Sequence, residues 1–177
     1  MRSIFCSPCT LEPQVTAHAH DMFVVLSDPA IYEFENEPPP SEEWLRNRFQ
    51  LLESRRSGDG REQWLNWVIR LPSGSLAGYV QATVLENHSA FVAYELHSKH
   101  WRQGIGSSAV RAMLQELYAQ HEVTDFIAVL KAANYRSKAL LEKLGFFAAS
   151  PEQQAMHRDE PDELVMVQSI RGVDPAT

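Results

Sequence analysis

Apolar positions recur along this 177-residue chain with two periods, one typical of amphipathic helices and one typical of strands. Steps of three and four residues predict helices over these stretches: residues 15–27, 42–54, 105–118 and a segment that ends at Leu144. Short apolar or alternating runs predict strands over these stretches: residues 9–12, 64–71, 76–85, 89–96, 125–130, 146–147 and 164–170. Proline-containing residues 31–40 and polar residues 151–161 are expected to be loops.

The order of these elements predicts a mixed sheet. Three strands between residues 64 and 96 are joined by short turns, which is typical of an antiparallel meander. A predicted helix then separates the strands over residues 89–96 and 125–130, and such a crossover normally joins parallel neighbours. We therefore expect an α/β (α+β) fold in one domain that spans residues 1–177.

One stretch joins a predicted strand to a predicted helix through two glycines. Residues 89–96 lead into Gly104 and Gly106, where the helix begins. The first N–H groups of a helix lack intrahelical partners, and glycine lets an anion approach the backbone closely. Ser107 adds a hydroxyl and Arg102 a positive charge. The stretch is a candidate phosphate-binding loop; a tight turn that binds no ligand is the alternative.

The same glycine pattern occurs in dinucleotide-binding enzymes, so an oxidoreductase is a second hypothesis. That fold needs several strand–helix–strand units and a strand that runs directly into the first glycine. Here polar and aromatic residues lie between Leu96 and Gly104, and hairpins precede the loop. We therefore disfavour the oxidoreductase class.

Composition narrows the remaining classes. The chain is 44% hydrophobic and 22% charged, which is typical of a globular protein. Its formal charge of −7 argues against a nucleic-acid partner. The charge favours a cationic partner, and an equal alternative is that it only aids solubility. No apolar run approaches the ~20 residues of a membrane span and no signal peptide is recognisable, so we expect a cytoplasmic protein. Cys6 and Cys9 are expected to be reduced thiols, and no metal site is expected.

Three segments resemble the GNAT superfamily of acetyl-CoA-dependent N-acyltransferases. They are residues 94–96 (YEL), 101–110 (WRQGIGSSAV) and 134–146 (NYRSKALLEKLGF), and their order and separation are similar to those of the family. The layout before them resembles the Rim-type branch, which contains ribosomal-protein N-terminal acetyltransferases. The resemblance implies a mixed, mostly antiparallel central sheet with a splayed parallel strand pair and helices on both faces.

The resemblance also implies which residues bind acetyl-CoA, the expected co-substrate. The family's pyrophosphate loop falls on residues 102–107, and the pantetheine arm is expected beside the strand that ends at Leu96. Asn134 matches a residue that contacts this arm. The implied coenzyme-binding residues are Leu96, Arg102, Gln103, Gly104, Ile105, Gly106, Ser107 and Asn134.

Two positions depart from the family pattern. The loop usually begins with Gln or Arg where this chain has Trp101, and many relatives carry a catalytic tyrosine where it has Leu141. Ser137 matches a serine proposed in the Rim branch to protonate the leaving thiolate. The resemblance therefore leaves the general-acid role to Ser137 or to Tyr135.

An acceptor amine must be neutral to attack a thioester, so a general base assists. Glu95 is the first candidate base because it lies on the predicted strand just before the glycine loop; Glu86 and His97 are weaker candidates. We expect Glu95 and Ser137 to catalyse direct transfer of an acetyl group to a primary amine in a ternary complex. A non-catalytic acyl-CoA-binding or partner-binding module on the same fold is the alternative.

The acceptor amine is expected to belong either to a small molecule or to a protein N-terminus. Its pocket is expected to be built by residues 31–40, the second helix and residues 151–161. Relatives are often dimers, so a homodimer is a candidate assembly.

Overall fold

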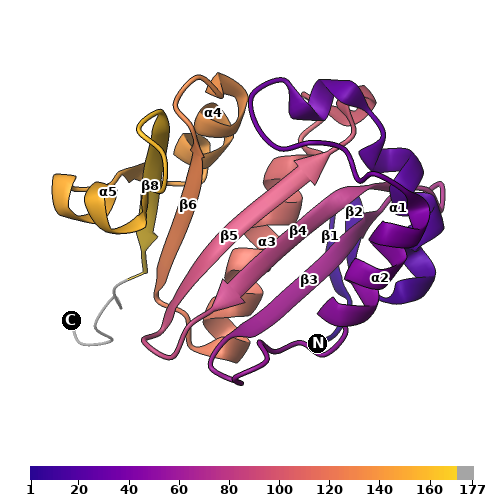
Figure 1. Ribbon diagram of the computed structural model, residues 1–177, viewed down its shortest axis with the longest axis horizontal. Helices are drawn as coiled ribbons and strands as arrows, with labels where there is room; N and C mark the ends of the chain where they lie inside the picture. The colour runs from indigo at the N-terminus through magenta and orange to yellow at the C-terminus, as the bar shows by residue number, and fades with distance from the viewer. Residues whose placement is uncertain (171–177) are drawn as a thin grey trace.

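The computed structural model describes residues 1–170, in which helices cover an eight-stranded sheet (Figure 1). The strands are β1 (Ile4–Cys6), β2 (Cys9–Pro13), β3 (Gln63–Arg70), β4 (Leu76–Val84), β5 (Ser89–Leu96), β6 (Asp125–Lys131), β7 (Phe147–Ala148) and β8 (Glu163–Ser169). The helices are α1 (Ala19–Leu26), α2 (Glu42–Leu52), α3 (Ile105–His121), α4 (Tyr135–Lys143) and α5 (Pro151–His157). The end of the expected domain, residues 171–177, lies outside the described part.

The strand order is β1-β2-β3-β4-β5-β6-β8-β7, and every neighbouring pair is antiparallel except β5 and β6. The parallel pair is registered only from Ser89 opposite Asp125 to Phe91 opposite Ile127. Beyond these positions the two strands separate toward the end of β5 that leads to α3 (Figure 1). The expected mixed sheet and its splayed parallel pair are both confirmed.

Both faces of the sheet are covered at β3, where five consecutive residues, Leu65 to Ile69, are buried. Successive strand residues point to opposite faces. Trp67 packs in the cluster that contains the buried residues of α3, whereas Val68 packs in the cluster formed with α1 and α2. Helices therefore cover both faces, as expected.

The N-terminal part differs from the sequence prediction in two ways. Strand β1 was not predicted, because three residues are too few to show a period. The predicted helix over residues 15–27 is divided into a 3₁₀ turn (Thr16–His18) and α1. Among the residues that the structure describes, no helix is both long and apolar enough to span a bilayer.

The prediction of a loop over residues 151–161 was wrong, because α5 occupies its first half. Ser150 accepts a hydrogen bond from the N–H of Gln153, whose side chain bonds back to Ser150, and Pro151 occupies the first turn. This capping box was readable in the sequence. It was missed because α5 buries no residue and so has no apolar stripe.

Cys6 and Cys9 face each other across the β1–β2 hairpin, where both are free and buried. Within residues 1–170, no three His, Cys, Asp or Glu side chains form a group that could hold a metal ion.

Candidate active site

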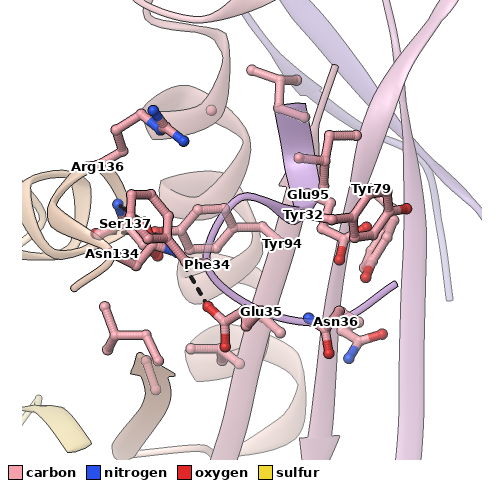
Figure 2. Close-up of a pocket in the computed structure, with 18 of the residues that line it drawn as sticks. Tyr32, Phe34, Glu35, Asn36, Tyr79, Tyr94, Glu95, Asn134, Arg136 and Ser137 are labelled. Carbon is pink, nitrogen blue, oxygen red and sulfur yellow. Dashed lines mark hydrogen bonds between the residues drawn. The ribbon is translucent and has the colours of Figure 1, made fainter. Parts of the chain in front are cut away.

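A groove of about 1800 Å³ opens where β5 and β6 separate (Figure 2). One wall is the second half of β5, and the opposite wall includes the start of α4. The segment 31–40, α2 and residues at the end of α5 complete the lining. The three regions expected to form the acceptor pocket therefore all border this groove.

The N-terminus of α3 opens onto the groove through Gly104 and Gly106. Gly104 is the N-cap, has a left-handed φ of 79°, and offers no side chain to bond the first N–H groups of the helix. A Cβ at Gly104 would meet nothing within 4 Å, so the backbone is open to an approaching group. At Gly106 a Cβ would lie 3.2 Å from Leu140, so this glycine permits close packing of α3 on α4.

The residues expected to bind the coenzyme divide into two sets. Most line the groove: Leu96, Arg102, Gly104, Gly106, Ser107 and Asn134. Gln103 and Ile105 instead line a second, smaller pocket beside Pro8 and Pro72. Ile105 is buried in the core, and the amide of Gln103 donates to the carbonyl of Lys99 at 2.8 Å. These two side chains therefore point away from the groove.

Glu95 lies in the groove wall with a perturbed acidity. Burial raises the pKa of its carboxyl to about 7, the charge of Glu35 adds to the rise, and a hydrogen bond from the Tyr79 hydroxyl opposes it. Figure 2 shows Glu95 beside Tyr79 and Tyr32. A carboxyl with this pKa can accept a proton near neutral pH.

The two weaker candidate bases lie elsewhere. His97 places Nδ1 3.0 Å from Oδ2 of Asp28. Glu86 lies just after β4, at the opposite end of β5 from Leu96. Neither side chain borders the groove, so the geometry favours Glu95 over both.

Ser137 lies in the first turn of α4, and its hydroxyl is paired with a tyrosine that the sequence analysis did not single out. The hydroxyl of Tyr94 is 2.8 Å from Oγ of Ser137 and 3.2 Å from the carbonyl oxygen of Ser137. Burial raises the pKa of Tyr94 to about 12, so the phenol stays protonated at neutral pH. A tyrosine on an apolar strand face usually has a partner for its hydroxyl, which was the available signal.

Tyr135, the second candidate acid, also borders the groove but is more exposed than Ser137. The residue is 58% exposed, and its ring packs edge-on against Phe34 at 5.8 Å between centroids. Its hydroxyl accepts a hydrogen bond from Arg136 at 3.3 Å. Leu141, where relatives carry tyrosine, is buried in the core. Of the two candidate acids, Ser137 is the more enclosed by the groove.

Residues 33–36, here called the strap, reach across to the start of α4. Glu33 forms an ion pair with Arg136 at 2.5 Å, and the Arg136 guanidinium lies 4.9 Å from the Phe34 ring centroid. Asn134 donates to Oε1 of Glu35 at 3.1 Å, the dashed line in Figure 2. These contacts join segments about a hundred residues apart, and no sequence pattern indicated them.

Comparisons with known proteins agree with this geometry. The sequence profile of the acetyltransferase (GNAT) domain matches residues 9–147. A comparison with curated protein sequences finds no match.

Solved structures show the same fold at low sequence identity. One is RimL, a ribosomal L7/L12 alpha-N-protein acetyltransferase in complex with coenzyme A (17% identity, 94% of this chain, 97% of that chain, TM-score 0.78). Another is the ribosomal-protein-S5-alanine acetyltransferase from Vibrio fischeri (16% identity, 94% and 96% coverage, TM-score 0.76). A third is the microcin C7 self-immunity acetyltransferase MccE in complex with acetyl-CoA and AMP (17% identity, 93% of each chain, TM-score 0.75).

Proposed function

The chain belongs to the acetyltransferase (GNAT) domain family and is an acetyl-CoA-dependent N-acetyltransferase; from this premise we propose that it acetylates a primary amine by direct attack in a ternary complex. The observation that carries the proposal is one groove lined by Glu95, by the Tyr94–Ser137 pair and by the open N-terminus of α3. These groups supply a base, a hydrogen-bond donor and an anion site side by side.

The coenzyme is bound mainly by backbone groups. Its diphosphate accepts hydrogen bonds from N–H groups at the start of α3, and Arg102 adds a positive charge. The pantetheine arm lies between β5 and β6, where it contacts Asn134 and passes Leu96. The uncapped Gly104 and the separation of the two strands support this assignment.

Two side chains assist the chemistry. The acceptor amine attacks the thioester carbonyl in its neutral form, and Glu95 takes one proton from its nitrogen as the C–N bond forms. The tetrahedral adduct collapses with the C–S bond broken, and the hydroxyl of Ser137 donates a hydrogen bond to the developing thiolate. The raised pKa of Glu95 and the position of Ser137 in the first turn of α4 support these roles.

The acceptor is a small-molecule amine or a protein N-terminal α-amine. Two solved relatives are described as ribosomal-protein acetyltransferases and a third as a microcin C7 self-immunity acetyltransferase, so both classes are retained. We also propose that residues 1–177 act as one domain, in the cytoplasm and as a candidate homodimer, with no nucleic acid or membrane as partner.

The experiment is an assay of acetyl-CoA-dependent thiol release over a panel of amines. The panel contains ribosomal-protein N-terminal peptides, polyamines, aminoglycosides and amino acids. Release with one amine class, lost in Glu95→Gln and Ser137→Ala and retained in Glu86→Gln, is the expected result. The last variant is a matched control because Glu86 lies outside the groove.

The alternative is a non-catalytic module that holds acyl-CoA or a partner on the same fold. It would bind acetyl-CoA in calorimetry but would release no thiol with any amine of the panel. Failure to bind acetyl-CoA at all would contradict the coenzyme assignment itself.

A further inference from the structure

Tyr94 bridges the two walls of the groove. It belongs to β5, yet its hydroxyl reaches the first turn of α4, where it meets both the carbonyl oxygen and Oγ of Ser137 (Figure 2). The phenol has one proton and two acceptors within hydrogen-bond distance. Which of them takes this proton decides where the proton of Ser137 points.

In one arrangement the phenol donates to the carbonyl of Ser137. The serine hydroxyl then donates back to the phenolic oxygen, and its proton is not available to a ligand in the groove. In the other arrangement the phenol donates to Oγ of Ser137, at the shorter distance of 2.8 Å. The serine proton must then find a different acceptor, and Ser137 borders the groove, where the leaving sulfur would lie.

We propose that Tyr94 is a positioning residue that donates a hydrogen bond to Oγ of Ser137 and thereby directs the serine proton to the leaving sulfur. The proposal rests on the proposed function, because it takes from it the role of Ser137. It adds a second residue, on the opposite wall of the groove, on which the donor capacity of Ser137 depends.

A purely structural role for Tyr94 as a helix cap explains less of the geometry. The unpaired groups at the start of a helix are N–H donors, which need acceptors. Asn134 already supplies one, since its Oδ1 accepts from the N–H of Ser137 at 3.1 Å. The short contact of Tyr94 is to a hydroxyl instead, and the serine that carries it borders the groove.

The atoms and protons balance without ionising Tyr94. The C–N bond forms, the C–S bond breaks with its electron pair left on sulfur, and Glu95 takes one proton from nitrogen. An alkyl thiol has a pKa of about 8.5, well below that of Tyr94, so transfer of the phenolic proton to the thiolate is uphill. Tyr94 and Ser137 therefore keep their protons, and the thiolate is stabilised by hydrogen bonding until solvent protonates it.

The test is a double-mutant cycle on the full chain with Tyr94→Phe, Ser137→Ala and the double variant, using acetyl-CoA and an accepted amine. Tyr94→Phe removes one hydrogen bond, so it is expected to lower kcat about three- to tenfold and to leave KM for acetyl-CoA unchanged. In the Ser137→Ala background the same change is expected to have no further effect. In a Ser137→Thr background, which keeps a hydroxyl, the loss should persist.

Tyr118→Phe is the matched control, since this tyrosine lies on α3 with 45% of its surface exposed. Thermal unfolding verifies that each variant is folded. An equal loss of kcat from Tyr94→Phe in the wild-type and Ser137→Ala backgrounds would overturn the proposal, because Tyr94 would then act without Ser137. A Ser137→Ala variant with full kcat would also overturn it, while acetyl transfer by the wild type would leave the wider function standing.

Discussion

The side-chain amide of Asn134 and the carboxylate of Glu35 meet across the groove, with Nδ2 of Asn134 3.1 Å from Oε1 of Glu35. Asn134 is the residue that we propose to contact the pantetheine arm, whereas Glu35 belongs to the strap. Acetyl-CoA would therefore have to compete with Glu35 for this amide. One of the contacts that hold the strap at the start of α4 is therefore the one that the coenzyme needs.

Removing this competitor should strengthen coenzyme binding. Glu35→Ala is expected to lower the Kd for acetyl-CoA about two- to tenfold, because the coenzyme no longer has to displace the hydrogen bond between Glu35 and Asn134. Isothermal titration calorimetry gives the Kd directly. Glu37→Ala, in the same proline-containing segment, is the control and should bind as the wild type does. Weaker binding by Glu35→Ala would mean that the strap supports the coenzyme site.

The pH dependence of turnover should report the carboxyl of Glu95. A base must be deprotonated to act, and the pKa of Glu95 is raised to about 7. The kcat/KM of the acceptor is therefore expected to rise through pH 7, with a loss of about 10²-fold or more in Glu95→Gln. A rising limb near pH 7 that persists unchanged in Glu95→Gln would assign the titration to another group.

The ionised carboxylate of Glu95 should destabilise the folded chain at alkaline pH. Its pKa is higher in the folded chain than its ordinary value of 4.5, so the folded state holds the proton more tightly. This contribution to stability is present below pH 4.5 and is lost as the pH rises to about 7. Glu95→Gln should therefore be more stable than the wild type at pH 8, by up to about 3 kcal/mol. Urea unfolding at pH 8 and pH 4.5 measures the change, and an equal difference at both would contradict it.

Glycine at position 78 should be required for the placement of Glu95. A Cβ on Gly78 would lie 2.0 Å from the carbonyl oxygen of Glu95 and 2.9 Å from Cα of Leu96. Gly78→Ala must displace β5 at these residues, with an expected cost of about 1–3 kcal/mol and a fall in kcat. Gly58→Ala is the control, because a Cβ there meets nothing within 4 Å. Denaturant unfolding that gave equal stability for the two variants would be contrary evidence.

The parts of the fold that follow local rules were predictable. The strands from β3 to β5 have clear periods and short turns, and the helix α2 begins after Ser41, whose Oγ accepts from the N–H of Trp44 at 3.0 Å. The glycine loop was recognisable because a strand, a turn and a helix start follow one another there. These signals lie within about ten residues of sequence, where periodicity and capping act.

The rest depends on contacts between distant segments. The pairing of Tyr94 with Ser137 joins residues 43 positions apart, and the link from Glu35 to Asn134 spans 99. The perturbed pKa of Glu95 likewise arises from burial and from Glu35. The sequence indicated Glu95 and Ser137 as single residues, but the partners that tune them come from the tertiary structure.

The most direct test of the central claim is mass spectrometry of the acceptor after incubation with acetyl-CoA and the full chain. The account predicts that the amine gains one acetyl group on nitrogen in step with thiol release. With the Glu95→Gln variant this acetylated product should not form. Thiol release without any acetylated amine would show hydrolysis of the thioester, and bound acetyl-CoA without either product would indicate a binding module. Either result would contradict the assignment of this groove to amine acetylation.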